Sequence, residues 1–193
     1  AAMPSWLVVI DEAYAEFRSP VEPMADVASW PPNAVVARTL SKLHGLAGLR
    51  VGYAVGPGWA LRAVARMGDE MSVGTLAAAA AVAAVTDGAR LKRVRAAILG
   101  RRERLAAGLS ARGFRVAPSE TNFLLVEPPP GLDALAWAEA LRERGVRVRR
   151  GRDLGVEGAL RVSVGSGPMQ RRLFAAVDSV LAEVGAAAGH AQA

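Results

Sequence analysis

The stretch AVVARTLSKLHGLAGLRVGYAV, residues 34–55, decides how the first part of the chain is expected to fold. It begins with an apolar run at 34–39 and ends with a second at 51–55, and both runs are typical of β-strands. Only 11 residues, 40–50, separate them, which is short for the helical crossover that joins two parallel strands. We therefore predict that the second strand returns antiparallel to the first.

Further elements are expected on either side of this stretch. The unbroken apolar run WLVVI at 6–10 is typical of a strand covered on both faces, and the resulting sheet is predicted to be mixed. Helices are predicted at 59–66 and along the alanine-rich stretch that ends at Val85, where residues 86–88 form a stop signal. The first part of the chain, up to about residue 88, is thus predicted to contain a sheet and helices.

The second part of the chain alternates helices with short strands. Amphipathic patterns predict helices at 90–111, from 132 to Gly145, and from Pro168 to just before Gly185, after which the tail is expected to fray. Strands are predicted within 114–127, at 146–149 and at 160–164. We predict the α/β class, with a first domain at 1–88 built on a mixed, mostly parallel sheet with helices, and a smaller α+β domain at 89–193.

Composition excludes several classes of protein. The 193 residues are 52% apolar, which indicates a globular chain. The absence of cysteine rules out disulfides and thiolate metal sites, and the longest apolar run, 75–85, is too short to cross a membrane. The first residues contain no basic region or small-residue cleavage site of a signal peptide. We therefore expect a cytoplasmic protein with no membrane span.

The positive charge does not indicate nucleic-acid binding. The chain has 24 Lys+Arg against 18 Asp+Glu, a net charge of +6, and its only lysines are Lys42 and Lys92. Seven cations gather at 90–104, but they alternate with apolar residues at helical spacing and no aromatic side chain interleaves with them. We interpret them as the solvated face of a helix. His44 and His190 lie far apart in the sequence, so no metal site is expected. The seven cations are Arg90, Lys92, Arg93, Arg95, Arg101, Arg102 and Arg104.

An acid follows the first predicted strand. Asp11 stands at the carboxyl end of that strand, where open α/β sheets bind ligands. A Walker-B acid on Mg²⁺ has the same setting, but no Gly-Lys dipeptide occurs in the chain, so the phosphate loop of an ATPase is absent from it. A helix cap or a turn residue is the structural alternative for Asp11.

A lysine follows the second predicted strand. Lys42 is notable in a chain that otherwise uses arginine, because only lysine can lose its proton and attack a carbonyl. Around it, Thr39 and Ser41 offer hydroxyl groups, and Arg50 offers a planar guanidinium group that can bind an anion through two N–H groups. These residues could hold a phosphate beside an amine. The alternatives are an ordinary surface lysine and hydroxyl groups that only cap the local backbone.

Five segments together resemble a known family. They are VIDEAYAEF at 9–17, RTLSK at 38–42, GLAGLRVGY at 45–53, PSETNF at 118–123 and ALRVSVG at 159–165. In this order and spacing they resemble the fold-type-I aminotransferases that use pyridoxal phosphate (PLP), and within these the histidinol-phosphate aminotransferase group. The resemblance covers about residues 6 to 184.

The resemblance implies a role for each matching residue of the first domain. Lys42 would form the covalent bond to PLP and carry the proton that is moved during the reaction. Asp11 would pair with the pyridine nitrogen, and Tyr14 would hydrogen-bond the 3-oxygen of the ring. Thr39, Ser41 and Arg50 would bind the phosphate of PLP.

The resemblance also implies how substrates bind and what the whole enzyme does. Arg161 would bind the substrate α-carboxylate, and Arg149 stands where a contact to the substrate phosphate is expected. The reaction would transfer the amino group of L-histidinol phosphate to 2-oxoglutarate, in a homodimer of full-length chains. The present chain corresponds to the C-terminal half of such an enzyme. The segment MGDEMSVG at 67–74 departs from the usual pattern of the group. Two alternatives stay open, a threonine-phosphate decarboxylase of cobamide synthesis and a non-catalytic aminotransferase-like regulatory module.

Overall fold

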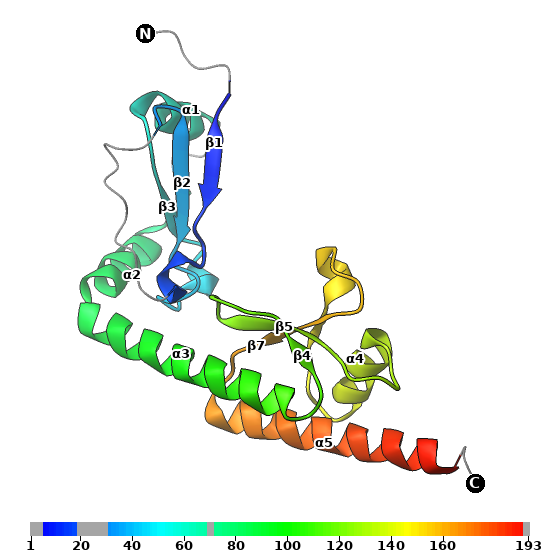
Figure 1. Cartoon of the computed structure of the whole chain (residues 1–193). Helices are drawn as coiled ribbons and strands as arrows, with labels where there is room; N and C mark the ends of the chain where they lie inside the picture. The colour runs from blue at the N-terminus through cyan, green and yellow to red at the C-terminus, as the bar shows by residue number, and fades with distance from the viewer. Residues whose placement is uncertain (1–5, 19–30, 69–71, 191–193) are drawn as a thin grey trace. The chain divides into compact units, whose positions relative to one another are not determined.

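The computed structural model describes residues 6–18, 31–68 and 72–190. The chain forms two compact units, Ala1–Arg95 and Ala96–Ala193, called unit 1 and unit 2 below. Figure 1 shows their elements along the chain. The units divide inside helix α3 (Gly88–Ser110), whereas the sequence predicted a domain boundary at the start of this helix.

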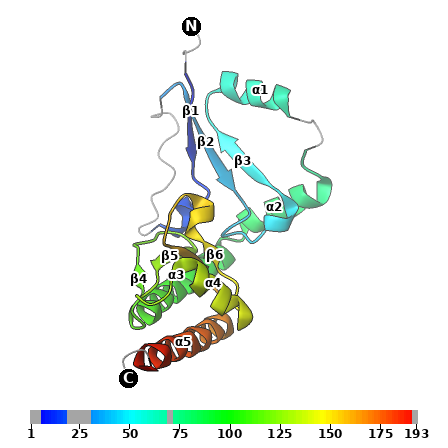
Figure 2. The same ribbon diagram turned by 90° about the vertical axis from the view of Figure 1, so that its right-hand side faces the viewer.

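Unit 1 contains a three-stranded mixed sheet. Its strands are β1 (Val8–Asp11), β2 (Ala34–Thr39) and β3 (Gly52–Val55), in the order β1-β2-β3 (Figure 2). β1 pairs with β2 in parallel, and β2 pairs with β3 antiparallel. Both the antiparallel return and the mixed sheet are therefore confirmed. Because β1 and β2 are parallel, their carboxyl ends, Asp11 and Thr39, emerge at the same edge of the sheet.

Strand β1 is less buried than its sequence predicts. Val9 is 63% exposed and Ile10 is 42% exposed, so the expectation of a strand covered on both faces is wrong for the described part of the chain. An apolar run shows only that a strand is suited to burial. The described residues supply β2 along one edge of β1, but they leave much of its surface open. The buried side chains of unit 1 lie mainly on β2 and the turn after it.

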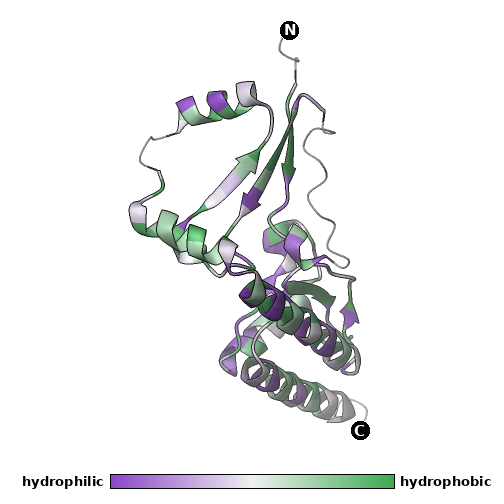
Figure 3. Ribbon diagram, turned by 90° about the vertical axis from the view of Figure 1, so that its left-hand side faces the viewer, coloured by the Kyte–Doolittle hydropathy of each residue, from purple (hydrophilic) through white to green (hydrophobic). Residues whose placement is uncertain are grey.

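The helices of unit 1 follow the prediction in position. They are α1 (Gly58–Met67) and α2 (Thr75–Thr86), and Asp87 after α2 accepts a hydrogen bond from the backbone N–H of Arg90, at the start of α3. α2 is apolar on all sides, and Figure 3 shows it almost without hydrophilic colour. Even so, Ala77 is its one buried residue. A helix of this kind is normally buried on every side.

The arginine-rich face of α3 is solvated only in part. Lys92, Arg93 and Arg104 are exposed, as predicted. However, three arginines are half-buried and donate to backbone carbonyl groups: Arg90 to His44, Arg95 to Glu16 and Arg18, and Arg102 to Thr121. The sequence pattern shows where a helix carries charge, but it does not show that a long arginine side chain lies down and binds a neighbouring loop.

Unit 2 is an antiparallel sheet packed against helices. The strands β4 (Arg115–Val116), β5 (Phe123–Glu127), β6 (Arg149–Arg150) and β7 (Leu160–Ser163) lie in the order β4-β5-β7-β6. With α3 and two further helices, α4 (Ala134–Glu143) and α5 (Gly167–His190), the sheet encloses one hydrophobic core. Phe114 and Trp137 meet edge to face there, with their ring centroids 5.0 Å apart. The side chains of this core that are at most 2% exposed are Leu105, Leu109, Leu124, Val126, Trp137, Leu141, Leu160, Val177 and Val180.

Two predictions for unit 2 are wrong in their bounds. The strand predicted at 146–149 is reduced to Arg149–Arg150, because Val146 and Val148 pack against the core without joining the sheet. The closing helix does not end before Gly185 but continues to His190, since the alanines after Gly185 favour helix. Residues 191–193 of the predicted frayed tail lie outside the described residues. None of the described helices is long and apolar enough to cross a membrane.

Candidate active site

A cavity of about 390 Å³ opens at the carboxyl ends of β1 and β2 in unit 1. It brings together five of the six residues predicted to bind the cofactor. The sixth, Tyr14, does not line the cavity, but the centroid of its ring lies 5.2 Å from Lys42 Nζ. The residues that line the cavity are Val9, Asp11, Ala13, Ala37, Arg38, Thr39, Ser41, Lys42, Ala47 and Arg50.

Asp11 is the last residue of β1, and the turn after this strand fixes its carboxylate. Its Oδ1 accepts a hydrogen bond of 2.9 Å from the backbone N–H of Ala13. The local turn predicted as the structural alternative is therefore present. A carboxylate has about four acceptor positions, so this contact leaves Asp11 able to accept another donor in the cavity.

Lys42 lies in a tight turn between β2 and β3. The backbone N–H of Gly45 donates to the carbonyl of Lys42 at 3.1 Å, and Gly45 has a φ of +78°, which glycine adopts readily. Lys42 Nζ lies over the ring of Tyr14, in the arrangement of a cation–π contact. An amine in a cavity with a fixed acid is equipped for carbonyl and proton chemistry.

The phosphate-binding group predicted from the sequence lies along one side of this turn. The Thr39 hydroxyl oxygen accepts a hydrogen bond of 3.0 Å from the backbone N–H of Ser41, so the local capping contact is also present. Arg50 follows the short helix η3 (Ala47–Leu49), and its Nη1 donates to the carbonyl of Ala47 at 3.0 Å. The φ of Arg50 is +51°, the only positive value at a non-glycine position in the described segments.

An ion pair beside the cavity was not identified from the sequence. Arg38 Nε and Nη2 donate to Glu12 Oε2 at 2.8 and 2.5 Å, which ties the end of β1 to β2. Burial opposes the charge of Arg38, but hydrogen bonds to Glu12 and Tyr53 outweigh it and raise its pKa above the ordinary value. The sequence does contain a signal for this ion pair, because Glu12 directly follows one strand and Arg38 lies near the end of the next. Only the parallel register shows that these two residues meet.

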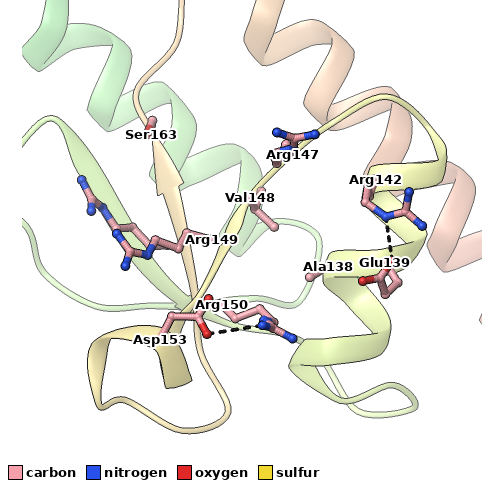
Figure 4. Close-up of a pocket in the computed structure, with 10 residues that line it drawn as sticks. Ala138, Glu139, Arg142, Arg147, Val148, Arg149, Arg150, Asp153 and Ser163 are labelled. Atoms are coloured by element: carbon pink, nitrogen blue, oxygen red, sulfur yellow. Dashed lines mark hydrogen bonds and ion pairs between the residues drawn. The ribbon is translucent and has the colours of Figure 1, made fainter.

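A second cavity, of about 610 Å³, lies in unit 2 and contains both predicted substrate-binding residues. Arg149 on β6 and Arg161 on β7 are register partners in the sheet. Figure 4 shows Arg149 among the other lining side chains. The lining residues are Ala138, Glu139, Arg142, Arg147, Val148, Arg149, Arg150, Asp153, Arg161 and Ser163.

The charges of the second cavity are only partly balanced. Arg142 pairs with Glu139 at 2.7 Å and Arg150 with Asp153 at 3.4 Å (Figure 4). Within the described segments, the other three arginines of the lining, Arg147, Arg149 and Arg161, have no ion pair with a carboxylate. The guanidinium carbon of Arg161 lies 4.0 Å from the centroid of the Phe123 ring, and its buried Nε has no hydrogen-bond partner among the residues that the structure describes. The cavity is thus suited to an anionic ligand.

The described residues contain no cluster of three or more His, Cys, Asp or Glu side chains that could hold a metal ion. His44 is buried and lies 2.9 Å from a carboxylate oxygen of Glu16. The side chain of His190 lies outside the described part. The predicted site residues therefore form two groups: an amine, an acid, two hydroxyl groups and an arginine at the cavity of unit 1, and an arginine-rich cavity in unit 2.

Comparison with known families gives one match that spans most of the chain. The family model described as aminotransferase class I and II matches residues 2–179. Among curated proteins, the histidinol-phosphate aminotransferase of Aromatoleum aromaticum is 39% identical over 184 residues, 94% of this chain and 51% of that protein. The same enzyme of Symbiobacterium thermophilum is 40% identical over 181 residues, 93% of this chain and 49% of that protein. The chain spans about half the length of the curated relatives it matches.

Solved structures give a similar result. A putative aminotransferase from Burkholderia pseudomallei has a TM-score of 0.80 and 35% identity, and covers 90% of this chain and 52% of that one. The histidinol-phosphate aminotransferase of Sinorhizobium meliloti, solved in complex with pyridoxal-5'-phosphate, has a TM-score of 0.76 and 29% identity, over 90% of this chain and 49% of that one.

Proposed function

We propose that this chain, which belongs to the family of class I and II aminotransferases, provides the lysine and the substrate arginines of a PLP-dependent enzyme. The proposed reaction transfers the amino group of L-histidinol phosphate to 2-oxoglutarate, which gives imidazole-acetol phosphate and L-glutamate. The observation that carries the proposal is the meeting of Lys42, Asp11 and Arg50 at one cavity of unit 1. The curated relatives named above support the choice of substrate.

The side chains of the unit 1 cavity fit PLP in their chemistry. An aldehyde needs an amine, a pyridine nitrogen needs an acid partner, and a phosphate needs a cation with hydrogen-bond donors. Lys42, Asp11 and Arg50 meet these three needs, and the hydroxyl groups of Thr39 and Ser41 add donors. When bound, PLP supplies an electron sink for the carbanion that forms at the substrate Cα.

Each residue of this cavity then has a defined task. Lys42 would hold the cofactor covalently and would carry the proton that moves to and from the substrate Cα. Asp11 would accept a hydrogen bond from the ring N–H and keep that nitrogen protonated, while its contact with Ala13 holds the carboxylate in place. Tyr14 does not line the cavity but lies beside Lys42, and its hydroxyl would orient the ring oxygen from there. Arg50 binds the phosphate as a planar fork.

The second cavity supports a substrate with two anionic groups. We assign Arg161 to the α-carboxylate, because the stacking on Phe123 holds its guanidinium plane and its Nε still lacks a partner. Arg149, its register partner on β6, is assigned to the phosphate. The remaining proposals for the full-length enzyme are a homodimer and a cytoplasmic location.

Trapping with borohydride tests the proposal. The chain is incubated with PLP, reduced, digested, and examined by peptide mass spectrometry. We expect a pyridoxyl adduct on Lys42 and not on Lys92, since Lys92 lies exposed on α3 outside the cavity. The variant Lys42→Arg should lose the adduct, and the matched control Lys92→Arg should retain it. An adduct that forms equally on both lysines of the wild type would contradict the assignment.

Product analysis then separates the proposed reaction from its alternative. Decarboxylation of a phosphorylated amino acid would use the same lysine but would release CO₂ without an oxo-acid acceptor. We expect glutamate to form from 2-oxoglutarate only when histidinol phosphate is present. This assay requires a sample in which Lys42 has been shown to form the adduct.

A further inference from the structure

A contact between a histidine and a glutamate connects the two segments that carry Tyr14 and Lys42. Glu16 lies in the short helix η1 (Ala15–Phe17), two residues after Tyr14, and His44 lies two residues after Lys42. His44 Nε2 is 2.9 Å from Glu16 Oε1. The side chain of His44 is 6% exposed and that of Glu16 is 29% exposed, so this contact is largely shielded from water.

Both ends of this pair are held by the same helix. Arg95 Nε on α3 donates to the backbone carbonyl of Glu16 at 2.9 Å. The guanidinium group of Arg90, also on α3, lies 3.4 Å from the carbonyl oxygen of His44. Phe17, which follows Glu16, is fully buried and anchors η1. The two segments are therefore fixed to one support as well as to each other.

The side chain of His44 is more polar than packing alone requires. Its Nδ1 is buried and has no hydrogen-bond partner among the described residues, an arrangement that an apolar side chain of similar size would avoid. A position that breaks the rule for buried polar atoms is often retained for a function. Here the polar atom that does have a partner, Nε2, makes the connection to Glu16.

We propose that the Glu16–His44 pair is a clamp that positions the amine of Lys42 against the ring of Tyr14. The clamp closes two residues beyond each of them, where it fixes the backbone that sets the 5.2 Å distance between Lys42 Nζ and the Tyr14 centroid. Glu16 and His44 are positioning residues, because they act through Tyr14 and Lys42 and not on a ligand. The importance of the clamp for catalysis rests on the proposed function. The clamp itself is argued only from contacts within the chain.

Competitive labelling of the two lysines tests the clamp without any cofactor. The chain is treated with a trace of acetic anhydride, and the acetylation of Lys42 is measured relative to that of Lys92, the only other lysine. Acetylation requires that the reagent reaches the amine, and the Tyr14 ring covers one side of Lys42 Nζ. In the variant Glu16→Ala we therefore expect the Lys42:Lys92 ratio to rise about threefold, a change typical of the loss of one coupled contact.

Three further variants make this experiment specific. Glu16→Asp keeps the charge but shortens the side chain, and it should raise the ratio like Glu16→Ala while leaving the far-UV circular dichroism unchanged. His44→Gln can still donate to Glu16 and should keep the wild-type ratio. Asp178→Ala breaks an ion pair of unit 2 and serves as the matched control, with the wild-type ratio expected.

An unchanged ratio in folded Glu16→Ala and Glu16→Asp would overturn the clamp. The same conclusion would follow if His44→Gln raised the ratio as much as Glu16→Ala does, because the donated hydrogen bond would then not matter. If the wild type forms no borohydride adduct with PLP, the proposed function fails, whereas the acetylation ratios still decide on the clamp. If the clamp and the proposed function both hold, the yield of adduct on Lys42 should be lower in Glu16→Ala than in the wild type.

Discussion

Arg50 combines a functional side chain with an unfavourable backbone. A φ of +51° places a Cβ-bearing residue in the left-handed region, which costs on the order of 1 kcal/mol relative to glycine. The residue ends η3, where this conformation turns the chain back into β3. A glycine would suit the turn better, and we propose that arginine is kept there because its side chain binds the ligand.

We therefore expect Arg50→Gly to separate stability from binding. Removal of the backbone strain should raise the free energy of unfolding by up to ~1 kcal/mol. Loss of the guanidinium should weaken PLP binding by about tenfold or more, as expected for a charge-assisted hydrogen bond. Thermal unfolding and a fluorescence titration with PLP measure the two effects. Arg50→Lys, which keeps both charge and strain, is the control, and a loss of stability in Arg50→Gly would contradict the interpretation.

The sequence predicted the residues of the site better than their contacts. Asp11, Thr39, Ser41, Lys42 and Arg50 were expected from their chemistry and now share one cavity. Glu12 and Arg38 were not singled out, because an ion pair between two strands depends on the register of the sheet. The contact between His44 and Glu16 could not be inferred from the sequence, because the two residues lie 28 positions apart.

At the scale of elements, loop length and turn residues predicted more than apolar runs did. The 11 residues at 40–50 correctly excluded a crossover helix, so β3 returns antiparallel to β2. The apolar run at 6–10 and the alternating segment VRVR at 146–149 misled in different ways. The first does form a strand, but it is exposed, and the second packs into the core as loop before a two-residue strand. Hydrophobicity alone does not tell what covers a segment.

The contact between Arg112 and α5 gives stability that depends on pH. Arg112 binds both carboxylate oxygens of Asp178 and stacks over Phe174. Hydrogen bonds from Arg112 lower the pKa of Asp178 below its usual value of 3.8, so the stabilisation is present above the unfolded pKa and is lost as the pH falls through the lower, folded value.

We expect Asp178→Asn to lower the free energy of unfolding at pH 7 by less than ~1 kcal/mol, because the pair is exposed to water. The difference from the wild type should shrink as the pH falls below about 4, where Asp178 becomes protonated in the unfolded chain. Urea denaturation at several pH values measures it. A difference that stays constant down to pH 2 would show that the charge of Asp178 is not involved.

The apolar surface of α2 leads to a prediction about solubility. Leu76 is 84% exposed and Val82 is 63% exposed, whereas Ala77 on the same helix is buried. Leu76→Lys with Val82→Lys should reduce the binding of the dye ANS and the light scattering of concentrated samples, with little change in the midpoint of thermal unfolding. Ala77→Lys is the control and should lower that midpoint. Unchanged dye binding in the double variant would show that α2 is covered in solution.

At the scale of the whole molecule, the two groups of site residues belong to separate compact units. Lys42 and its neighbours lie in unit 1, and Arg149 and Arg161 lie in unit 2. Sequence reasoning assigned both groups from one resemblance and separated them by a domain boundary. It also indicated that the family extends well beyond this chain, which agrees with coverage of about half of each relative.

The arginines of α3 have a consequence for how fast anions arrive. Arg90 and Arg95 donate to carbonyl oxygens, which carry no net charge, in a chain of net charge +6. Such a charge draws phosphorylated small molecules in from solution before any of them touches a binding residue. The association rate constant of PLP, followed by stopped-flow fluorescence, should therefore fall as ionic strength rises, while its dissociation rate constant changes little. The helix that supports the lysine turn would then also raise the rate at which anionic ligands reach that turn.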